Sequence, residues 1–154
     1  MRRPIIQFES NRLGDDIATL SCGHSQRSQR NSLFINQTKI ALEEISNSPI
    51  GVNLNCFQCD KFELPDHFVP YKKTPIFTEE SLPVALTRDH STKIGIWAKI
   101  IISEGKLRYR VDILKADMEL SQDKSGIIIP EIMHNVEPLG IVSFFIQFYK
   151  APTV

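Results

Sequence analysis

Short apolar runs separated by turn-forming residues fill the chain from residue 71 onward. Runs of about four to eight residues rich in β-branched and aromatic side chains are typical of strands. The predicted strands are residues 71–77, 84–86, 94–102, 107–114, 127–129, 135–136 and 141–149. Residues 103–106 (Ser-Glu-Gly-Lys) predict a hairpin turn, and residues 116–120 predict an edge strand or a loop. Strands this short and frequent, without helices between them, predict an antiparallel sandwich or a closed barrel.

The first 64 residues have a sparser apolar pattern. Residues 4–8 and 17–20 predict short strands, whereas residues 40–45 fit either a strand or a short helix. A stretch punctuated by prolines at residues 64–70 is typical of an extended linker. We therefore expect two domains, a small α+β domain at residues 1–64 and a mainly β domain at residues 65–154.

Charge is balanced along the chain. Seven basic and seven acidic residues lie in residues 1–64, and eleven of each lie in residues 65–154. No region builds the positive field that a phosphate backbone requires, so the composition argues against nucleic-acid binding. No apolar run approaches the ~20 residues that span a bilayer, and the N-terminus has no secretory apolar segment. The sequence therefore predicts a cytoplasmic protein without a membrane partner.

The seven glycines are scattered along the chain rather than grouped in motifs. None forms a G-x-G, a G-K-[ST] or a G-x-S-x-G pattern. Dinucleotide-binding folds, P-loops and the nucleophile turn of α/β-hydrolases need these patterns. The sequence therefore excludes those three classes.

All three cysteines lie in the first domain, within two pairs of metal-binding residues. Cys22 and His24 form a C-x-H pair, and 31 residues separate it from the C-x-x-C pair of Cys56 and Cys59. Four such ligands suit tetrahedral zinc, and Gly23 allows the tight turn between the first two. A full set of protein ligands leaves no open position, so the sequence predicts a structural zinc in a zinc-ribbon-like domain. A metal-free C-x-x-C loop with a surface histidine and a redox C-x-x-C are the alternatives.

Two histidines stand at the ends of predicted strands in the second domain. Extending the apolar face of residues 94–102 backwards reaches Thr92 and His90, and His134 shares a face with Val136. Histidines at the mouth of a small barrel are common ligands for a divalent metal. The alternative is that each histidine caps a strand by hydrogen bonding to the backbone. His67, in the linker, is assigned no role.

Several segments of the second domain closely resemble one known family. They are residues 71–75, 77–83, 90–95, Trp97, 104–105 and 130–138. In this order they resemble the TehB/YeaR-like domain, a bacterial family linked by name to tellurite resistance and similar to cupins. The resemblance implies a double-stranded β-helix that holds a divalent metal through histidines and a carboxylate, with His90 near the first cupin motif and His134 in the second. The usual H-x-H reads His90-Ser91-Thr92 here, and Gln147 stands in place of a carboxylate.

The first domain is also similar to a known module. Residues 18–24 and 53–60 resemble a small bacterial Cys/His-rich domain of unknown function. Its relatives carry additional histidines after the C-G-H motif, where this chain has residues 25–32, Ser-Gln-Arg-Ser-Gln-Arg-Asn-Ser. The four predicted zinc ligands are all present.

Together these features predict a protein that binds a small ligand or an oxyanion, of the tellurite-resistance or stress-response type. Thr92, Tyr109 and Gln147 are the predicted polar contacts to the ligand. One alternative is a metal-dependent cupin enzyme, an oxygenase or isomerase, that uses His90 and His134. A second alternative is a scaffold or regulatory protein in which neither domain does chemistry. Because cupins often pair through strand edges, the resemblance makes a homodimer plausible.

Overall fold

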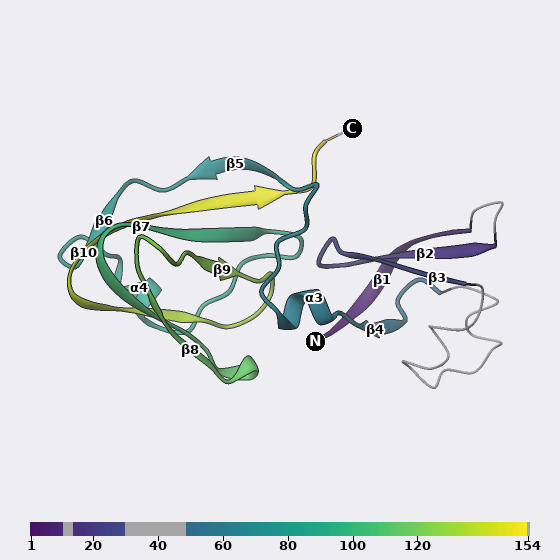
Figure 1. The fold of residues 1–154 in the computed structure, drawn as a ribbon, viewed down its shortest axis with the longest axis horizontal. Coiled ribbons are helices and arrows are strands. Elements are labelled where there is room, and N and C mark those ends of the chain that lie inside the picture. The colour runs from purple at the N-terminus through teal and green to yellow at the C-terminus, as the bar shows by residue number, and fades with distance from the viewer. Residues whose placement is uncertain (11–13, 30–48, 154) are drawn as a thin grey trace. The chain divides into compact units, whose positions relative to one another are not determined.

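The computed structural model describes residues 1–10, 14–29 and 49–153, which form two compact units, Met1–Lys61 and Phe62–Val154. Both units are built mainly from antiparallel strands (Figure 1), so the prediction of a mainly β chain is confirmed. The element predicted at residues 40–45 lies outside the described residues. No described helix has the length and apolar composition needed to cross a membrane.

The first unit is a four-stranded antiparallel sheet with the strand order β3-β2-β1-β4. Its elements are β1 (Arg2–Ser10), β2 (Asp15–Leu20), β3 (Ser25–Gln29), β4 (Asn53–Asn55) and the four-residue helix α3 (Phe57–Asp60). Buried and half-buried residues alternate along β2, which places Ala18 and Leu20 on the inner face beside Ile5 and Leu54. The strands predicted at residues 4–8 and 17–20 fall within β1 and β2.

The second unit contains a six-stranded antiparallel sheet. Its elements are β5 (Val69–Lys73), β6 (Phe77–Thr78), α4 (Val84–Thr87), β7 (Trp97–Val111), η1 (Asp112–Leu114), β8 (Ala116–Leu120), β9 (Gly126–Ile128) and β10 (Asn135–Lys150). The order is β5-β10-β7-β8, with β6 also paired to β10 and β9 to β7. The long strands β7 and β10 bend, so the sheet forms a half-barrel (Figure 1). Its inner face carries the buried apolar side chains of both strands, including Ile100, Tyr109 and Phe144.

The prediction of a hairpin turn at residues 103–106 is wrong, because the chain continues through these residues as part of β7. This strand pairs with β10 on both sides of Gly105, and the register shifts between Pro138 and Val142. Gly105 has a φ of +76°, and a Cβ there would collide with the backbone oxygen of Ile141. Only glycine fits this position. The turn signal in the sequence therefore marks an irregularity in a long strand.

Further expectations also differ from the structure, among them the end of the strand predicted at residues 107–114, because residues 112–114 form η1. Residues 84–86, predicted as a strand, lie in the short helix α4, which begins after Pro83. Residues 94–96 precede β7 in a turn instead of extending it, and Ile94 is 59% exposed. A three-residue apolar run cannot distinguish a strand from a helical turn by its periodicity.

Candidate functional site

The two pairs of metal-binding residues in the first unit converge on one point. Cys22 and His24 lie in the tight turn between β2 and β3, where the backbone N–H of Leu20 donates to the carbonyl of His24 at 2.9 Å. Gly23, with a φ of +95°, allows this turn. Cys56 immediately precedes α3, and the first turn of that helix carries Cys59. A strand connection and a helix start therefore supply one pair each.

The spacing of the four ligand atoms matches the edges of a small tetrahedron. The Nδ1 atom of His24 lies 3.4 Å from Cys22 Sγ, 3.3 Å from Cys56 Sγ and 3.8 Å from Cys59 Sγ. The Sγ atoms of Cys22 and Cys56 are 3.7 Å apart, and all four ligand atoms lie within 4.8 Å of one another. Bond lengths of ~2.3 Å to sulfur and ~2.0 Å to nitrogen give tetrahedral edges of about 3.8 Å between two sulfurs and about 3.5 Å between sulfur and nitrogen. The donor set therefore fits one metal ion.

Burial and charge also suit a metal ion in this cluster. All four side chains are buried, and the cysteines are free thiols rather than a disulfide. Burial alone lowers the pKa of His24, but hydrogen bonds to the sulfurs of Cys22 and Cys56 outweigh it and raise that pKa to about 9. Hydrogen bonds from Cys22 and Cys59 lower the pKa of the Cys56 thiol. Cys56 is therefore favoured as a thiolate, whereas His24 keeps a proton that a bound metal ion would displace.

A second pair of side chains comes together in the other unit, where His90 and His134 face each other. Their backbones form an isolated antiparallel bridge with N–H···O distances of 3.0 and 2.9 Å. Their ring centroids are 4.2 Å apart, and the Tyr109 ring packs edge-on against His134 with a centroid distance of 5.9 Å. The sequence placed each histidine on the apolar face of its strand. In the structure the two rings are in direct contact.

Hydrogen bonds fix the same orientation in both rings. The Nδ1 atom of His90 lies 2.9 Å from the carbonyl oxygen of Arg88, and that of His134 lies 3.0 Å from the carbonyl of Ile132. A carbonyl only accepts, so both Nδ1 atoms carry a proton and each neutral ring bears its lone pair on Nε2. Burial lowers the pKa of His134 to about 4, which keeps this ring neutral at neutral pH. Its Nε2 atom is buried and makes no hydrogen bond to any residue that the structure describes.

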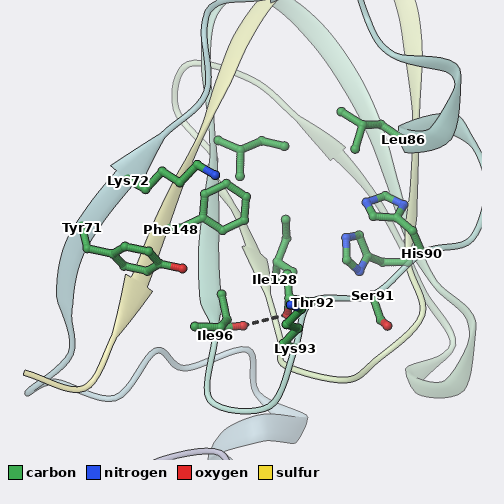
Figure 2. A pocket seen from close by; sticks show the side chains of 12 residues that line it. Tyr71, Lys72, Leu86, His90, Ser91, Thr92, Lys93, Ile96, Ile128 and Phe148 are labelled. Carbon is green, nitrogen blue, oxygen red and sulfur yellow. Dashed lines mark hydrogen bonds between the residues drawn. The ribbon is translucent and has the colours of Figure 1, made fainter.

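The two histidines line a cavity of about 400 Å³, which we call the histidine cavity (Figure 2). Its walls combine apolar side chains with a few polar ones. They are Tyr71, Lys72, Leu86, His90, Ser91, Thr92, Lys93, Ile96, Ile128, His134, Ile146 and Phe148. Segments from β5, β9 and β10, helix α4 and the loop before β7 therefore build one concave site.

The predicted ligand contacts fall in three different places. Thr92 lines the histidine cavity, where its hydroxyl donates to the carbonyl of Ile96 at 2.7 Å. Tyr109 is outside the lining, and its hydroxyl donates to the carbonyl of Ile127. Gln147 is also outside the lining, and its amide donates to the carbonyl of Lys72. Sequence reasoning missed Lys72 and Lys93, although both lie in segments that carry the family resemblance.

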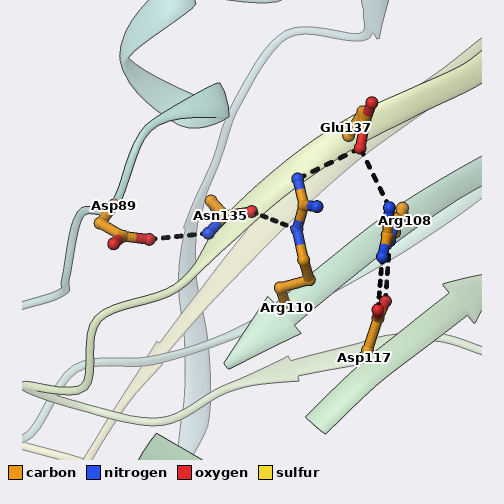
Figure 3. A network of polar contacts seen from close by, with 6 residues as sticks. All are labelled: Asp89, Arg108, Arg110, Asp117, Asn135 and Glu137. Atoms are coloured by element: carbon orange, nitrogen blue, oxygen red, sulfur yellow. Dashed lines mark hydrogen bonds and ion pairs between the residues drawn. The ribbon is translucent and has the colours of Figure 1, made fainter. Parts of the chain in front are cut away.

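A polar network fastens the two histidine segments from the exposed side of the sheet (Figure 3). The carboxylate of Asp89 accepts from the amide of Asn135 at 2.7 Å, which joins the residue before His90 to the residue after His134. The network continues from Asn135 through Arg110 to Glu137. Two further hydrogen bonds join Arg108 to Asp117. Side chains as well as the backbone bridge therefore hold the histidines in register.

Comparisons with known families agree with this division into two units. Residues 72–146 match the family model described as a TehB-like domain. Residues 6–63 match the model of a protein of unknown function, DUF3565. The first match contains both histidines and the second contains all four residues of the Cys/His cluster.

Two curated relatives are named probable S-adenosyl-L-methionine-dependent methyltransferase TehB, from two strains of Haemophilus influenzae. They are 26% and 25% identical to this chain over 82 residues, which cover 50% of it. The chain spans only 29% of the length of these relatives.

Two solved structures share the fold. The crystal structure of TehB from Haemophilus influenzae has a TM-score of 0.52 at 25% identity, over 56% of this chain and 32% of that one. A protein from Escherichia coli strain K12 has a TM-score of 0.56 at 19% identity, over 59% of this chain and 98% of that one. The second similarity concerns the fold alone. Taken with the family models, these findings show that this chain carries a TehB-like domain at residues 72–146, preceded by a DUF3565 domain at residues 6–63.

Proposed function

We propose that this chain is a small-ligand-binding protein of the tellurite-resistance type, whose second unit is a cupin-like double-stranded β-helix. The histidine cavity is the observation that carries the proposal. A concave site of about 400 Å³ with mostly apolar walls and a few convergent polar groups is typical of small-molecule sites. His90 lines this wall with its Nδ1 atom held by the carbonyl of Arg88, which leaves its Nε2 atom as an acceptor for a ligand.

We also propose that the first unit is zinc-ribbon-like and that Cys22, His24, Cys56 and Cys59 hold a structural zinc. Three thiolates and one imidazole are a common ligand set for structural zinc, and soft sulfur ligands disfavour magnesium and calcium. Because all four positions would be filled by protein, the metal would serve folding rather than catalysis.

A metal-dependent enzyme is the second candidate function, and one observation favours it. His90 and His134 both use Nδ1 to donate to a backbone carbonyl, which leaves Nε2 as the ligating atom, as in metal-binding histidines. Among the residues that the structure describes, no third His, Cys, Asp or Glu joins them in a possible metal cluster. The ligand-binding proposal needs no such third group. We do not extend methyl transfer to this chain, because it matches only 29% of the methyltransferases' length.

Filling the histidine cavity tests the ligand-binding proposal. Ile96 lines the cavity, whereas Ile94, two residues earlier, is 59% exposed and does not line it. We expect a screen of small molecules by protein NMR to yield ligands that shift the resonances of the cavity residues. Ile96→Trp should abolish those shifts, and Ile94→Trp should preserve them. Ligands that bind both variants equally, or that shift only residues elsewhere, would contradict the proposal.

A further inference from the structure

We propose that the histidine cavity selects a small organic anion with a hydrogen-bond donor at its far end. In this arrangement a carboxylate lies near Lys72, an apolar body lies against Phe148 and Ile128, and a hydroxyl or N–H group faces the His90–His134 pair. The inference rests on the proposed function, since it names the class of ligand for the same cavity.

The charge of the lining residues favours an anion. Lys72 and Lys93 line the cavity, and no Asp or Glu is among the lining residues. Figure 2 shows the Lys72 side chain directed into the cavity rather than away from it. Among the residues that the structure describes, neither lysine forms an ion pair with a carboxylate. Positive charge that is not neutralised within the described chain is available to a ligand.

The apolar walls require that the anion be organic. Leu86, Ile96, Ile128, Ile146 and Phe148 form the apolar part of the lining. A small inorganic oxyanion would lose its hydration against these side chains, and the few polar side chains of the lining would replace only part of its hydrogen bonds. A molecule with an apolar body would instead gain free energy by burying that body.

The histidine pair defines the far end of the ligand. Figure 2 shows Lys72 and His90 on opposite sides of the cavity, with Phe148 and Ile128 between them. The Nδ1 atom of His90 donates to the carbonyl of Arg88, so the neutral imidazole of His90 offers only an acceptor on Nε2. An acceptor selects a ligand that donates, such as a hydroxyl. The cavity thus has an anion-binding end at Lys72 and, on its opposite side, an end at His90 that binds a hydrogen-bond donor.

Three fragments separate these contributions, namely 4-hydroxybenzoate, benzoate and phenol, with tellurite as the inorganic oxyanion. Titrations followed by NMR chemical shifts measure weak dissociation constants and map the binding site at the same time. We expect 4-hydroxybenzoate to bind more tightly than benzoate and phenol. We expect tellurite to cause no displacement of 4-hydroxybenzoate from the cavity.

Two adjacent lysines provide a matched pair of variants. Lys72 lines the cavity, whereas the ammonium of Lys73 lies over the Phe145 ring, 5.9 Å from its centroid. Lys72→Met should weaken the binding of 4-hydroxybenzoate and benzoate by about fivefold and leave phenol unchanged. Lys73→Met should change none of the three. His90→Phe should remove the advantage of 4-hydroxybenzoate over benzoate while keeping the ring.

The outcomes separate this inference from the proposed function. If phenol binds in the cavity as tightly as 4-hydroxybenzoate, or if both lysine variants behave alike, the cavity binds ligands but does not select an anion. Displacement of 4-hydroxybenzoate by tellurite would overturn the requirement for an organic ligand. If none of the organic probes shifts the cavity resonances and the wider screen also yields no ligand, the proposed function fails as well.

Discussion

The two units use the same kind of strand but obtain their stability differently. In the first unit, a few apolar side chains such as Ile5 and Leu54 lie beside a buried cluster of three thiols and an imidazole. In the second unit, a continuous cluster of apolar side chains covers the inner face of β7 and β10. Small domains bury too little surface to be stable without a staple. A metal-binding cluster can therefore replace an apolar core of the size seen in the second unit.

Removal of the metal should give the largest difference between the units. We expect the purified protein to contain one zinc per chain, and a strong chelator or His24→Gln should unfold the first unit. NMR spectra should then lose the dispersed signals of β1 to β4 and keep those of the second unit. His67→Gln is the matched histidine control and should keep both metal and structure. Wild-type protein that contains no metal and is unaffected by chelator would contradict the zinc assignment.

Truncation of a core side chain in the second unit should destabilise that unit and leave the first unit folded. Phe144 is fully buried and packs edge-on against Phe77. Phe144→Ala should destabilise the second unit by about 3–5 kcal/mol through lost burial and a cavity, without loss of zinc. Phe145→Ala, on the next and half-buried residue, should cost clearly less in chemical denaturation. Equal losses in the two variants would mean that the inner face is not the main source of stability.

Acidification should weaken the second unit through His134. Its pKa is lowered from 6.5 to about 4 by burial, so below pH 6.5 the unfolded chain binds a proton that the folded chain excludes. The neutral His134 side chain therefore makes its full contribution to the free energy of unfolding above pH 6.5. This contribution declines by about 3 kcal/mol as the pH falls to 4. Denaturation curves of His134→Gln should lack this component of the pH dependence, whereas those of His67→Gln should retain it. A wild-type stability that stays constant between pH 6.5 and 4 would argue against a buried neutral histidine.

The exposed ion pairs should have the smallest effect. Arg108 and Asp117 are joined by two hydrogen bonds, but their side chains are 39% and 51% exposed. Solvent screens such pairs, so Arg108→Met should change the Tm by no more than about 5 °C. Differential scanning calorimetry measures this shift. A change as large as that of Phe144→Ala would show that the polar network, and not the core, holds the strands together.

The metal-binding pairs were predictable from the sequence because short spacing dictates their local geometry. Residues one or three positions apart, such as Cys56 and Cys59, can reach one ion from a tight turn or a helix start. The apolar runs likewise predicted a strand at residues 141–149, which lies within β10. The resemblance to a TehB-like domain was confirmed by the family model over residues 72–146.

Long-range pairing was not predictable in the same way. Gly105 signalled a turn because sequence reasoning could not know that β10 pairs with β7 on both sides of it. Strand β3 (Ser-Gln-Arg-Ser-Gln) has no apolar residue, so only its backbone pairing with β2 identifies it as a strand. Lys72 joins the cavity through the pairing of β5 with β10, which connects residues about 75 positions apart. These features depend on tertiary contacts rather than on local pattern.

The pairing of β10 has a consequence for the order of events during synthesis. In the described sheet, β5 and β6 form hydrogen bonds only with β10. Strand β10 also pairs with β7 over more residues than β8 or β9 does. A ribosome therefore releases β5 and β6 well before the strand that completes their hydrogen bonds. Until β10 emerges, only the pairs of β7 with β8 and β9 can form. The second unit should consequently fold late and in one cooperative step, and hydrogen exchange on stalled chains would detect that delay.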